Sequence, residues 1–215
     1  RRPACCTATS PMDSSSAMRP SRPSASLRRV FALMVLGACA HGPPPAEPSA
    51  PAPPAGGTPI SEAERSALAG TWVYVGGDAE LGEVEQAVER ATADMGFLAR
   101  GLAADALRAR ARPRPTYTLS FDGSTVSIAS PDHPTERGEV GGPPVRITDR
   151  LGDENQTTFQ LRDGALVEAG KSADGSGETV FAPSADGRTL RVRRLMQSGR
   201  LSAPVDVTLS YRRLD

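Results

Sequence analysis

Four Asp-Gly pairs divide the C-terminal half of this chain, at Asp122-Gly123, Asp163-Gly164, Asp174-Gly175 and Asp186-Gly187. Asp-Gly readily adopts the positive φ angles of tight hairpin turns, and between alternating apolar residues it is the strongest local hairpin signal. From Thr116 onward apolar and polar residues alternate with a period of two, as in strands with one buried face. This pattern predicts strands near 116–121, 124–130, 144–149, 156–162, 165–171, 178–182, 188–196 and 204–213.

A further strand and a long helical segment precede these hairpins. Ser61 is a suitable N-cap for a short helix ending near Gly70, and residues 71–75 then favour a strand. Residues 79 to about 110, with Asp78 as N-cap, carry apolar residues spaced alternately by three and four, which is typical of one apolar helix face. Gly96 and Gly101 could divide the segment into a helix pair. The stripe consists of Leu81, Val84, Val88, Ala91, Met95, Leu98 and Leu102.

About nine strands with one polar face each either form a sandwich or close on themselves. Closure removes the exposed edges, so we predict a mainly β fold, an antiparallel up-and-down β-barrel with a long helical insertion, 79–112, after the first strand. The predicted domain covers residues 60–215. Gly42 to Pro59 contains eight prolines and predicts an extended tether, so residues 39–59 are expected to lie outside the domain.

The N-terminal region has the parts of a secretory signal. Arg28 and Arg29 precede the apolar run 30–38, which is too short to span a bilayer and ends in Leu36-Gly37-Ala38-Cys39. This ending resembles the lipobox of bacterial lipoproteins, which implies that Cys39 is lipidated, for instance with palmitate, after removal of a signal peptide at 18–38. Residues 1–17 are then not translated, and Ala40 implies an outer-membrane anchor. An ordinary secretory signal is the alternative.

Composition argues against several functional classes. Of the 25 basic and 25 acidic residues, six basic and one acidic precede Cys39, so the remainder is mildly acidic and gives no reason to expect nucleic acid. With Cys39 lipidated, no thiol remains for disulfides or metal sites. His41 and His133 are the only histidines, which makes an activated nucleophile improbable. We therefore predict no enzymatic activity and no cofactor.

The order of elements resembles the lipocalin and fatty-acid-binding (calycin) superfamily. Gly70-Thr71-Trp72 is similar to the Gly-x-Trp of that family's first strand, and Tyr211-Arg212-Arg213 ends the last strand. The resemblance implies that Arg213 packs over Trp72. It also implies a two-helix lid between the first and second strands, where the insertion falls.

Arg194 is the most suggestive charged residue of the predicted strands. It shares a face with Leu190, Val192 and Met196, and a buried guanidinium is costly unless it is paired. We hypothesise that Arg194, with Tyr117 and Tyr211, binds the anionic head of an apolar ligand inside the barrel. The alternatives are an internal pair with Glu168 in a filled barrel, or a solvated strand end.

The remaining ligand candidates are Trp72 and Arg213, by resemblance. Asp132, His133 and Glu136 stand in a Pro-flanked segment that we interpret as a solvated loop, since three such residues form only a weak metal-site pattern. The overall hypothesis is a non-enzymatic, outer-membrane-anchored lipoprotein facing the periplasm or the cell surface, binding a fatty acid or lipid-like ligand. The alternative is a structural lipoprotein with a filled barrel that docks a protein partner through helix 79–110.

Overall fold

A computed structural model describes residues 60–214, which form three helices and ten strands. The predicted signal peptide, Cys39 and the tether lie outside the described residues. The helices are α1 (Glu62–Leu68), α2 (Gly77–Ala91) and α3 (Phe97–Ala111). The strands are β1 (Gly70–Tyr74), β2 (Thr116–Asp122), β3 (Thr125–Ser130), β4 (His133–Glu139), β5 (Val145–Thr148), β6 (Glu154–Arg162), β7 (Ala165–Lys171), β8 (Ser176–Pro183), β9 (Thr189–Gln197) and β10 (Val205–Leu214).

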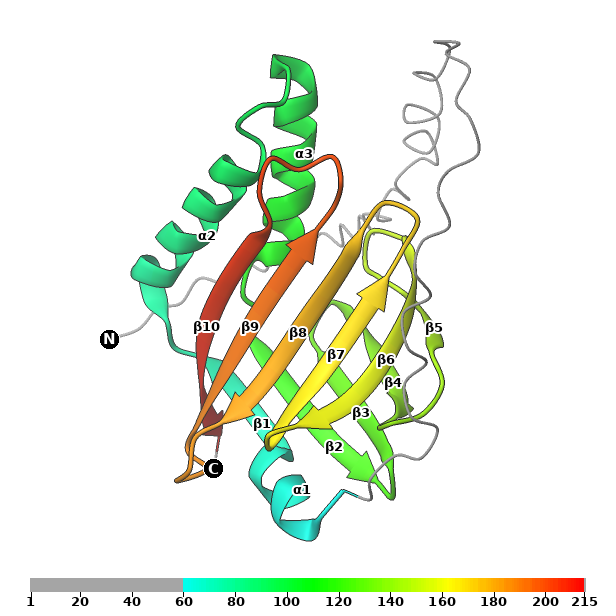
Figure 1. The fold of residues 1–215 in the computed structure, drawn as a ribbon. Helices are drawn as coiled ribbons and strands as arrows, with labels where there is room; N and C mark the ends of the chain where they lie inside the picture. Colours follow the sequence, from blue (N-terminus) through cyan, green and yellow to red (C-terminus); the bar gives the residue numbers. More distant parts are fainter. Residues whose placement is uncertain (1–59, 215) are drawn as a thin grey trace, which may run out of the picture. The chain divides into compact units, whose positions relative to one another are not determined.

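All ten strands belong to one antiparallel sheet with the order β4-β3-β2-β1-β10-β9-β8-β7-β6-β5. Strands that follow each other along the chain are paired, except β4 and β5, which are the two edges of the sheet, and β1 also pairs with β10. The two edges of the sheet approach each other, because Val140 forms a bridge to Phe159 and Gly141 donates its N–H to the Phe159 carbonyl over 2.7 Å. The predicted mainly β barrel with helices after the first strand is therefore confirmed, nearly closed and with ten strands rather than about nine (Figure 1).

The Asp-Gly pairs stand between consecutive strands, as predicted. They separate β2 from β3, β6 from β7, β7 from β8 and β8 from β9. Gly123, Gly164 and Gly187 have φ angles of 60°, 75° and 67°. In the β6–β7 turn Asp163 also has a positive φ, of 52°, which is the backbone of a type I′ hairpin.

One strand is missing from the sequence-based prediction. Residues 131–136 were expected to form a solvated loop, but β4 begins at His133, after a turn in which Asp132 has a φ of 60°. The interpretation of Glu136 as solvated is wrong, since only 8% of this residue is exposed. β4 contains no large apolar residue. Its buried positions are occupied by Glu136 and Gly138, which alternate with exposed polar residues.

The weak metal-site pattern in this segment is not supported by the geometry. Burial, and then the charge of Arg114, lowers the pKa of His133 to about 4. Among residues 60–214, no group of three or more His, Cys, Asp or Glu side chains is arranged to hold a metal ion.

Helices cover the two ends of the barrel. At one end lies α1, whose Leu68 is buried and whose N-terminus has the predicted Ser61 cap in a full capping box with Glu64 (Figure 1). At the other end α2 packs Val84 and Ala91 into the same hydrophobic core as the buried residues of β10. The helix pair therefore holds the position that the calycin resemblance implied for a lid.

The predicted helix over 79–110 is two helices, and its N-cap is Gly76 rather than Asp78. α2 ends at Ala91, whose carbonyl accepts the Ser202 N–H, while the Thr92 hydroxyl donates to the Val88 carbonyl. The chain turns before Gly96, so the apolar stripe does not continue. Val84, Val88 and Ala91 of the stripe are buried. Leu81, Leu98 and Leu102 are 38%, 80% and 59% exposed.

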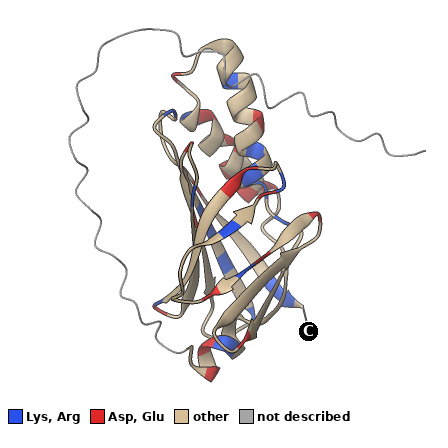
Figure 2. Cartoon of the chain, turned by 90° about the vertical axis from the view of Figure 1, so that its right-hand side faces the viewer, with Lys and Arg blue, Asp and Glu red and all other residues tan. Residues whose placement is uncertain are grey.

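Charged residues of both signs are distributed over the strands and helices of the domain (Figure 2). The inward-facing residues are mainly apolar and form one core of buried side chains from all parts of the sheet. Its largest fully buried members are Trp72, Tyr117, Tyr211, Phe159 and Phe181.

We predict that Gly138→Ala destabilises the barrel where its edges meet. A Cβ at Gly138 would stand 2.5 Å from the Phe159 ring, so the ring or strand β4 must move. Such overpacking costs about 1–3 kcal/mol, measurable by urea unfolding. Gly170→Ala is the matched control, because its new Cβ meets the Thr157 hydroxyl oxygen at 3.6 Å, an ordinary contact. Equal stability of the two variants would contradict the prediction.

Candidate functional site

Arg194 lies inside the barrel, as predicted, with 8% of its area exposed. Its Nη1 donates to the carbonyls of Arg110 over 2.5 Å and Arg112 over 3.3 Å, and its Nη2 donates to the Tyr117 hydroxyl over 2.6 Å. The two carbonyls belong to the end of α3 and the residue after it, where helix carbonyls lack partners within the helix. Arg194 thus joins the helix pair to the sheet.

Tyr117 and Tyr211 lie beside Arg194, so the structure brings together the three residues of the ligand hypothesis. Their ring centroids are 5.2 Å apart, and Tyr117 also meets the edge of Phe181 at 5.2 Å. The Tyr211 hydroxyl donates to the Arg114 carbonyl over 3.0 Å. Both tyrosines are fully buried, and burial raises the pKa of Tyr211 above its usual value.

Arg114 and Glu136 are site residues that the sequence analysis did not select. Arg114 lies in the connection between α3 and β2, and its Nη2 donates to Glu136 Oε1 over 2.8 Å. Their side chains are only 11% and 10% exposed. The Arg114 guanidinium also stands 5.3 Å from the centroid of the Tyr117 ring. A buried guanidinium is therefore paired here, but it belongs to Arg114 rather than Arg194.

Glu168 completes this group, which we call the internal cluster: Arg114, Tyr117, Glu136, Glu168, Arg194 and Tyr211. Glu168 stands opposite Thr179 in the sheet, and Thr179 stands opposite Arg194. The alternative Arg194–Glu168 pair is absent among the ion pairs within 4.0 Å of residues 60–214. Burial, and then the charge of the neighbouring Glu136 carboxylate, raises the pKa of Glu168 to about 8. Glu168 is therefore mainly protonated at neutral pH.

Several buried polar atoms of the internal cluster have no hydrogen-bond partner among the described residues. They are Nε and Nη1 of Arg114 and Oε2 of Glu136. Most buried polar groups in proteins are paired, so unpaired ones require a functional explanation or an additional bound group.

The other two predicted site residues, Trp72 and Arg213, form a separate contact. The Arg213 guanidinium lies 4.6 Å from the centroid of the Trp72 ring, the arrangement that the resemblance implied. Arg213 also donates to the carbonyls of Ser66 and Ala67, and Trp72 Nε1 donates to the Leu68 carbonyl over 3.0 Å. These bonds hold α1 against the barrel, so this pair stabilises the end that α1 covers.

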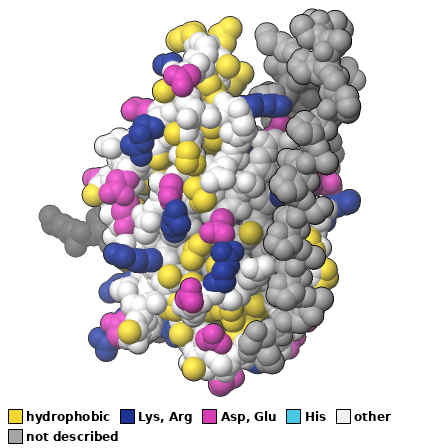
Figure 3. Space-filling view, viewed as in Figure 1, with side chains coloured by type: hydrophobic (Ala, Val, Ile, Leu, Met, Phe, Trp, Pro, Cys, Tyr) yellow, Lys and Arg dark blue, Asp and Glu magenta, His cyan; other side chains and the backbone are white. Residues whose placement is uncertain are grey.

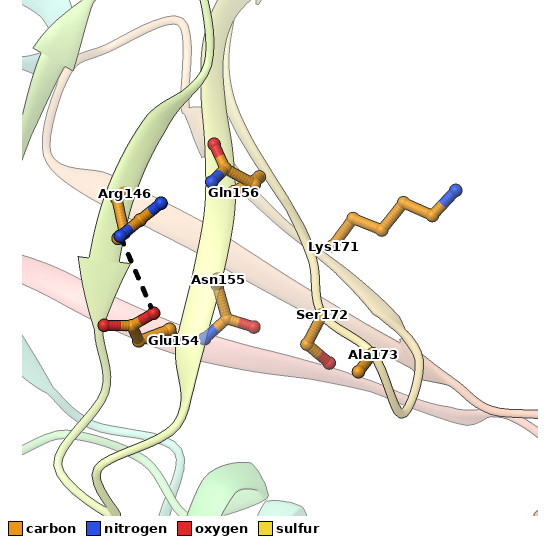
Figure 4. A pocket seen from close by; sticks show the side chains of 7 residues that line it. All are labelled: Arg146, Glu154, Asn155, Gln156, Lys171, Ser172 and Ala173. Carbon is orange, nitrogen blue, oxygen red and sulfur yellow. Dashed lines mark ion pairs between the residues drawn. The ribbon is translucent and has the colours of Figure 1, made fainter.

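Two surface recesses lie outside the internal cluster. One, of about 320 Å³, is lined by polar residues of β5, β6 and the β7–β8 turn, with Arg146 and Glu154 paired over 4.0 Å (Figure 4). The other is a groove of about 810 Å³ between α2 and α3, with Phe97, Leu98 and Leu102 in its walls. Apolar side chains gather on the helix pair at the top of the molecule (Figure 3). Among residues 60–214 no helix has the length and apolar character needed to cross a membrane.

Comparisons with known proteins give structural similarity without sequence similarity. No protein-family model and no curated protein matches this chain. Among solved structures, the fatty acid transporter REP1-NXSQ is 17% identical with a TM-score of 0.41, covering 69% of this chain and 96% of its own. A fatty-acid-binding protein from Drosophila melanogaster brain is 13% identical with a TM-score of 0.44, covering 67% and 98%.

Lipid binding protein 8 of Caenorhabditis elegans is about as similar to this chain as the two proteins above. It is 15% identical with a TM-score of 0.45, covering 72% of this chain and 99% of its own. These TM-scores are below 0.5, so the fold assignment rests on the strand order and the helix positions described above.

We predict that the stability of the folded domain decreases as the pH rises from about 5 to 8. The folded state holds a proton on Glu168 up to its pKa of about 8, whereas an unfolded glutamic acid releases it near 4.5, so the folded state binds more protons in this interval. The slope is at most about 1.4 kcal/mol per pH unit. In Glu168→Gln this contribution disappears.

The measurement is urea unfolding at a series of pH values. The control is Glu83→Gln, which removes an exposed carboxylate of α2 and should keep the wild-type profile. A Glu168→Gln profile parallel to that of the wild type would refute the assignment.

Proposed function

We propose that this chain is a non-enzymatic lipoprotein, anchored to the outer membrane through Cys39, whose barrel binds a small apolar or amphiphilic ligand. A fatty acid or a similar lipid is the ligand class that suits the interior. The signal pattern of residues 18–39 supports the anchor and the periplasmic location, and the fold supports a container with its ends covered by helices.

The observation that carries the binding proposal is the internal cluster itself. The barrel interior is otherwise apolar, with walls that include Phe181, Val192 and Leu209. Burying two arginines inside such walls lowers the stability of the barrel, because the desolvation penalty of buried charges often exceeds the energy gained by pairing them. Binding of an amphiphilic ligand explains the two arginines, since the apolar chain of the ligand can lie against the apolar walls while its head group contacts the cluster.

Burial of the inward face is less complete near Glu168. Glu168, Gly170 and Thr179 face inward by their register and are nevertheless only partly buried. Their neighbours Leu166 and Phe181, further along the same strands, are fully buried. Burial on this face therefore decreases from Phe181 towards Glu168, the side on which we place the head group.

We predict that Arg194→Met abolishes retention of the ligand. Arg194 fixes Tyr117 and the end of α3, so its loss displaces both the cluster and the helix pair. The measurement is native mass spectrometry of the full chain, purified without organic extraction, in which a bound ligand adds a reproducible mass. Arg193→Met is the control, because Arg193 pairs with Asp206 at the exposed surface. A folded Arg194→Met variant that keeps the extra mass would disprove the proposal.

The second candidate function is docking of a protein partner through the helix pair. Phe97 and Leu98 at the start of α3 are 89% and 80% exposed, and Leu102 one turn later is 59% exposed. Exposed apolar side chains grouped in this way mark interaction surfaces, whereas single ones are common everywhere. This observation favours α3, rather than the whole segment 79–110, as the docking element.

We predict that a partner or a second copy bound by α3 is lost in Leu98→Asp. A carboxylate at this position must keep its hydration shell, which prevents close apolar contact. The measurement is sedimentation velocity of the full chain, alone and with any co-purifying partner. Leu214→Asp is the control, because Leu214 is also exposed, at 59%, and its neighbour Arg213 contacts α1 at the other end of the barrel. Association that survives Leu98→Asp and Met95→Asp would exclude docking through this helix.

A further inference from the structure

The helix pair presents protruding side chains and a groove next to one another. Phe97 and Leu98, at the start of α3, are 89% and 80% exposed, so nearly the whole of each side chain is in solvent. Both also belong to the wall of the groove of about 810 Å³ between α2 and α3. A Cβ added at Gly101, in the same wall, would meet no atom within 4 Å, so the groove is open at this point. The same surface therefore has both projections and a recess.

The two helices that form the groove carry opposite charges. α2 has five acidic residues and one arginine, whereas α3 has three arginines and one acidic residue. Within one copy the helices are joined by the ion pair between Arg108 and Glu85, over 2.6 Å.

Glu89 of α2 and Arg100 of α3 also line the groove. Both are exposed, and neither forms an ion pair within 4.0 Å among residues 60–214. Arg100 donates to the carbonyl of Ala93, and its charge has no carboxylate partner among these residues. The groove therefore offers a carboxylate and a guanidinium with which a bound partner can pair.

We propose that the partner docked on α3 is a second copy of this chain, related by a two-fold axis that places Glu89 of each copy opposite Arg100 of the other. A two-fold interface uses the same patch on both sides, so the patch has to be complementary to itself. A surface with projections beside a recess, and with both signs of charge, meets this condition. The inference rests on the second candidate function, docking through α3, whose partner it names, and is independent of the ligand-binding proposal.

Burial of apolar side chains drives this association. Phe97, Leu98 and Leu102 of each copy, the last 59% exposed, are removed from water when the two helix pairs meet. An interface built on one helix pair lies at the lower end of the size range of specific interfaces, so the dimer should dissociate on dilution. The exposed charges determine which orientation of the two copies is favoured.

A second copy suits the charge of the helix pair better than an anionic membrane surface does. Residues 77–111 contain seven acidic and four basic residues, a net charge of −3. Anionic lipids attract segments rich in lysine and arginine, so a segment with excess negative charge is repelled. In the two-fold arrangement, by contrast, the acidic helix of each copy lies against the basic helix of the other.

The test is sedimentation velocity of the full chain at a series of protein concentrations, with two charge-reversed variants. In Glu89→Arg or Arg100→Glu alone, two pairs of like charges meet across the axis, so self-association should weaken by about tenfold. In an equimolar mixture of these variants each pair again consists of opposite charges, so association should return to that of the wild type. The variant with both substitutions in one chain should also associate like the wild type.

Two further charge reversals are the controls. Glu83→Arg makes the first change at an exposed residue of α2 that is outside the groove lining. Arg137→Glu makes the second change on β4, at a side chain that is 61% exposed. Both variants should associate like the wild type. Added salt should reduce the difference between the single groove variants and the wild type, because exposed charges are screened.

The outcomes distinguish this inference from the docking function on which it rests. If the wild-type chain is monomeric at every concentration, a second copy is excluded as the partner, while docking of a different protein on α3 is still judged by Leu98→Asp. If the chain associates and Leu98→Asp leaves this unchanged, docking through α3 and the inference both fail. If Leu98→Asp weakens association but the mixture of charge-reversed variants does not restore it, the pairing of Glu89 with Arg100 is overturned.

A lipid surface as the occupant of α3 gives a different result. The wild-type chain would then be monomeric without lipid and would co-sediment with phosphatidylglycerol vesicles more strongly than Leu98→Asp does. This result would overturn the inference in favour of membrane contact. Restoration of the dimer in the mixture of the two variants would support the second copy, because contact with lipid does not depend on mixing the two charge reversals.

Discussion

The hydrogen bonds from Arg194 to the end of α3 join the helix pair to the sheet. One guanidinium on β9 binds the carbonyls of Arg110 and Arg112 and the hydroxyl of Tyr117. These partners belong to the helix pair, to the connection that follows it and to the second strand. The helix pair, the barrel wall and the internal cluster therefore share one fixed point.

The burial of Arg194 can be predicted from the sequence, whereas its hydrogen-bond partners cannot. Arg194 shares the inward face of its strand with Leu190 and Val192, so period-two alternation is sufficient to predict that it is buried. The alternation does not reveal which acceptor it meets, because the carbonyls come from a segment about 80 residues earlier that has no strand pattern. Arg114 stands between two prolines in that connection, where no periodicity predicts the direction of a side chain.

The fold itself was largely predictable because its signals are local. Asp-Gly turns and alternating faces define most hairpins, and they determine which residues of β2, β9 and β10 face inward. β4 was not predictable in this way, since its inward positions are occupied by Glu136 and Gly138 rather than by large apolar residues. The division into α2 and α3 was indicated only by Gly96 and Gly101, because the spacing of apolar residues continues through the turn. Ser202 of a distant loop stabilises this turn. Of the internal cluster, Glu136 lies in β4 and was therefore missed.

Because β1 pairs with β10, the barrel can close only after the last strand is present. Thr71 stands opposite Leu214, so the first strand of the sheet receives one of its two neighbours from the last residues of the chain. Contacts between such distant segments require a large loss of chain entropy on loop closure before they stabilise the fold. A partly synthesised chain therefore has an open edge at β1, with Trp72 lacking the Arg213 guanidinium that covers it. The barrel remains a curved open sheet until its last strand is available.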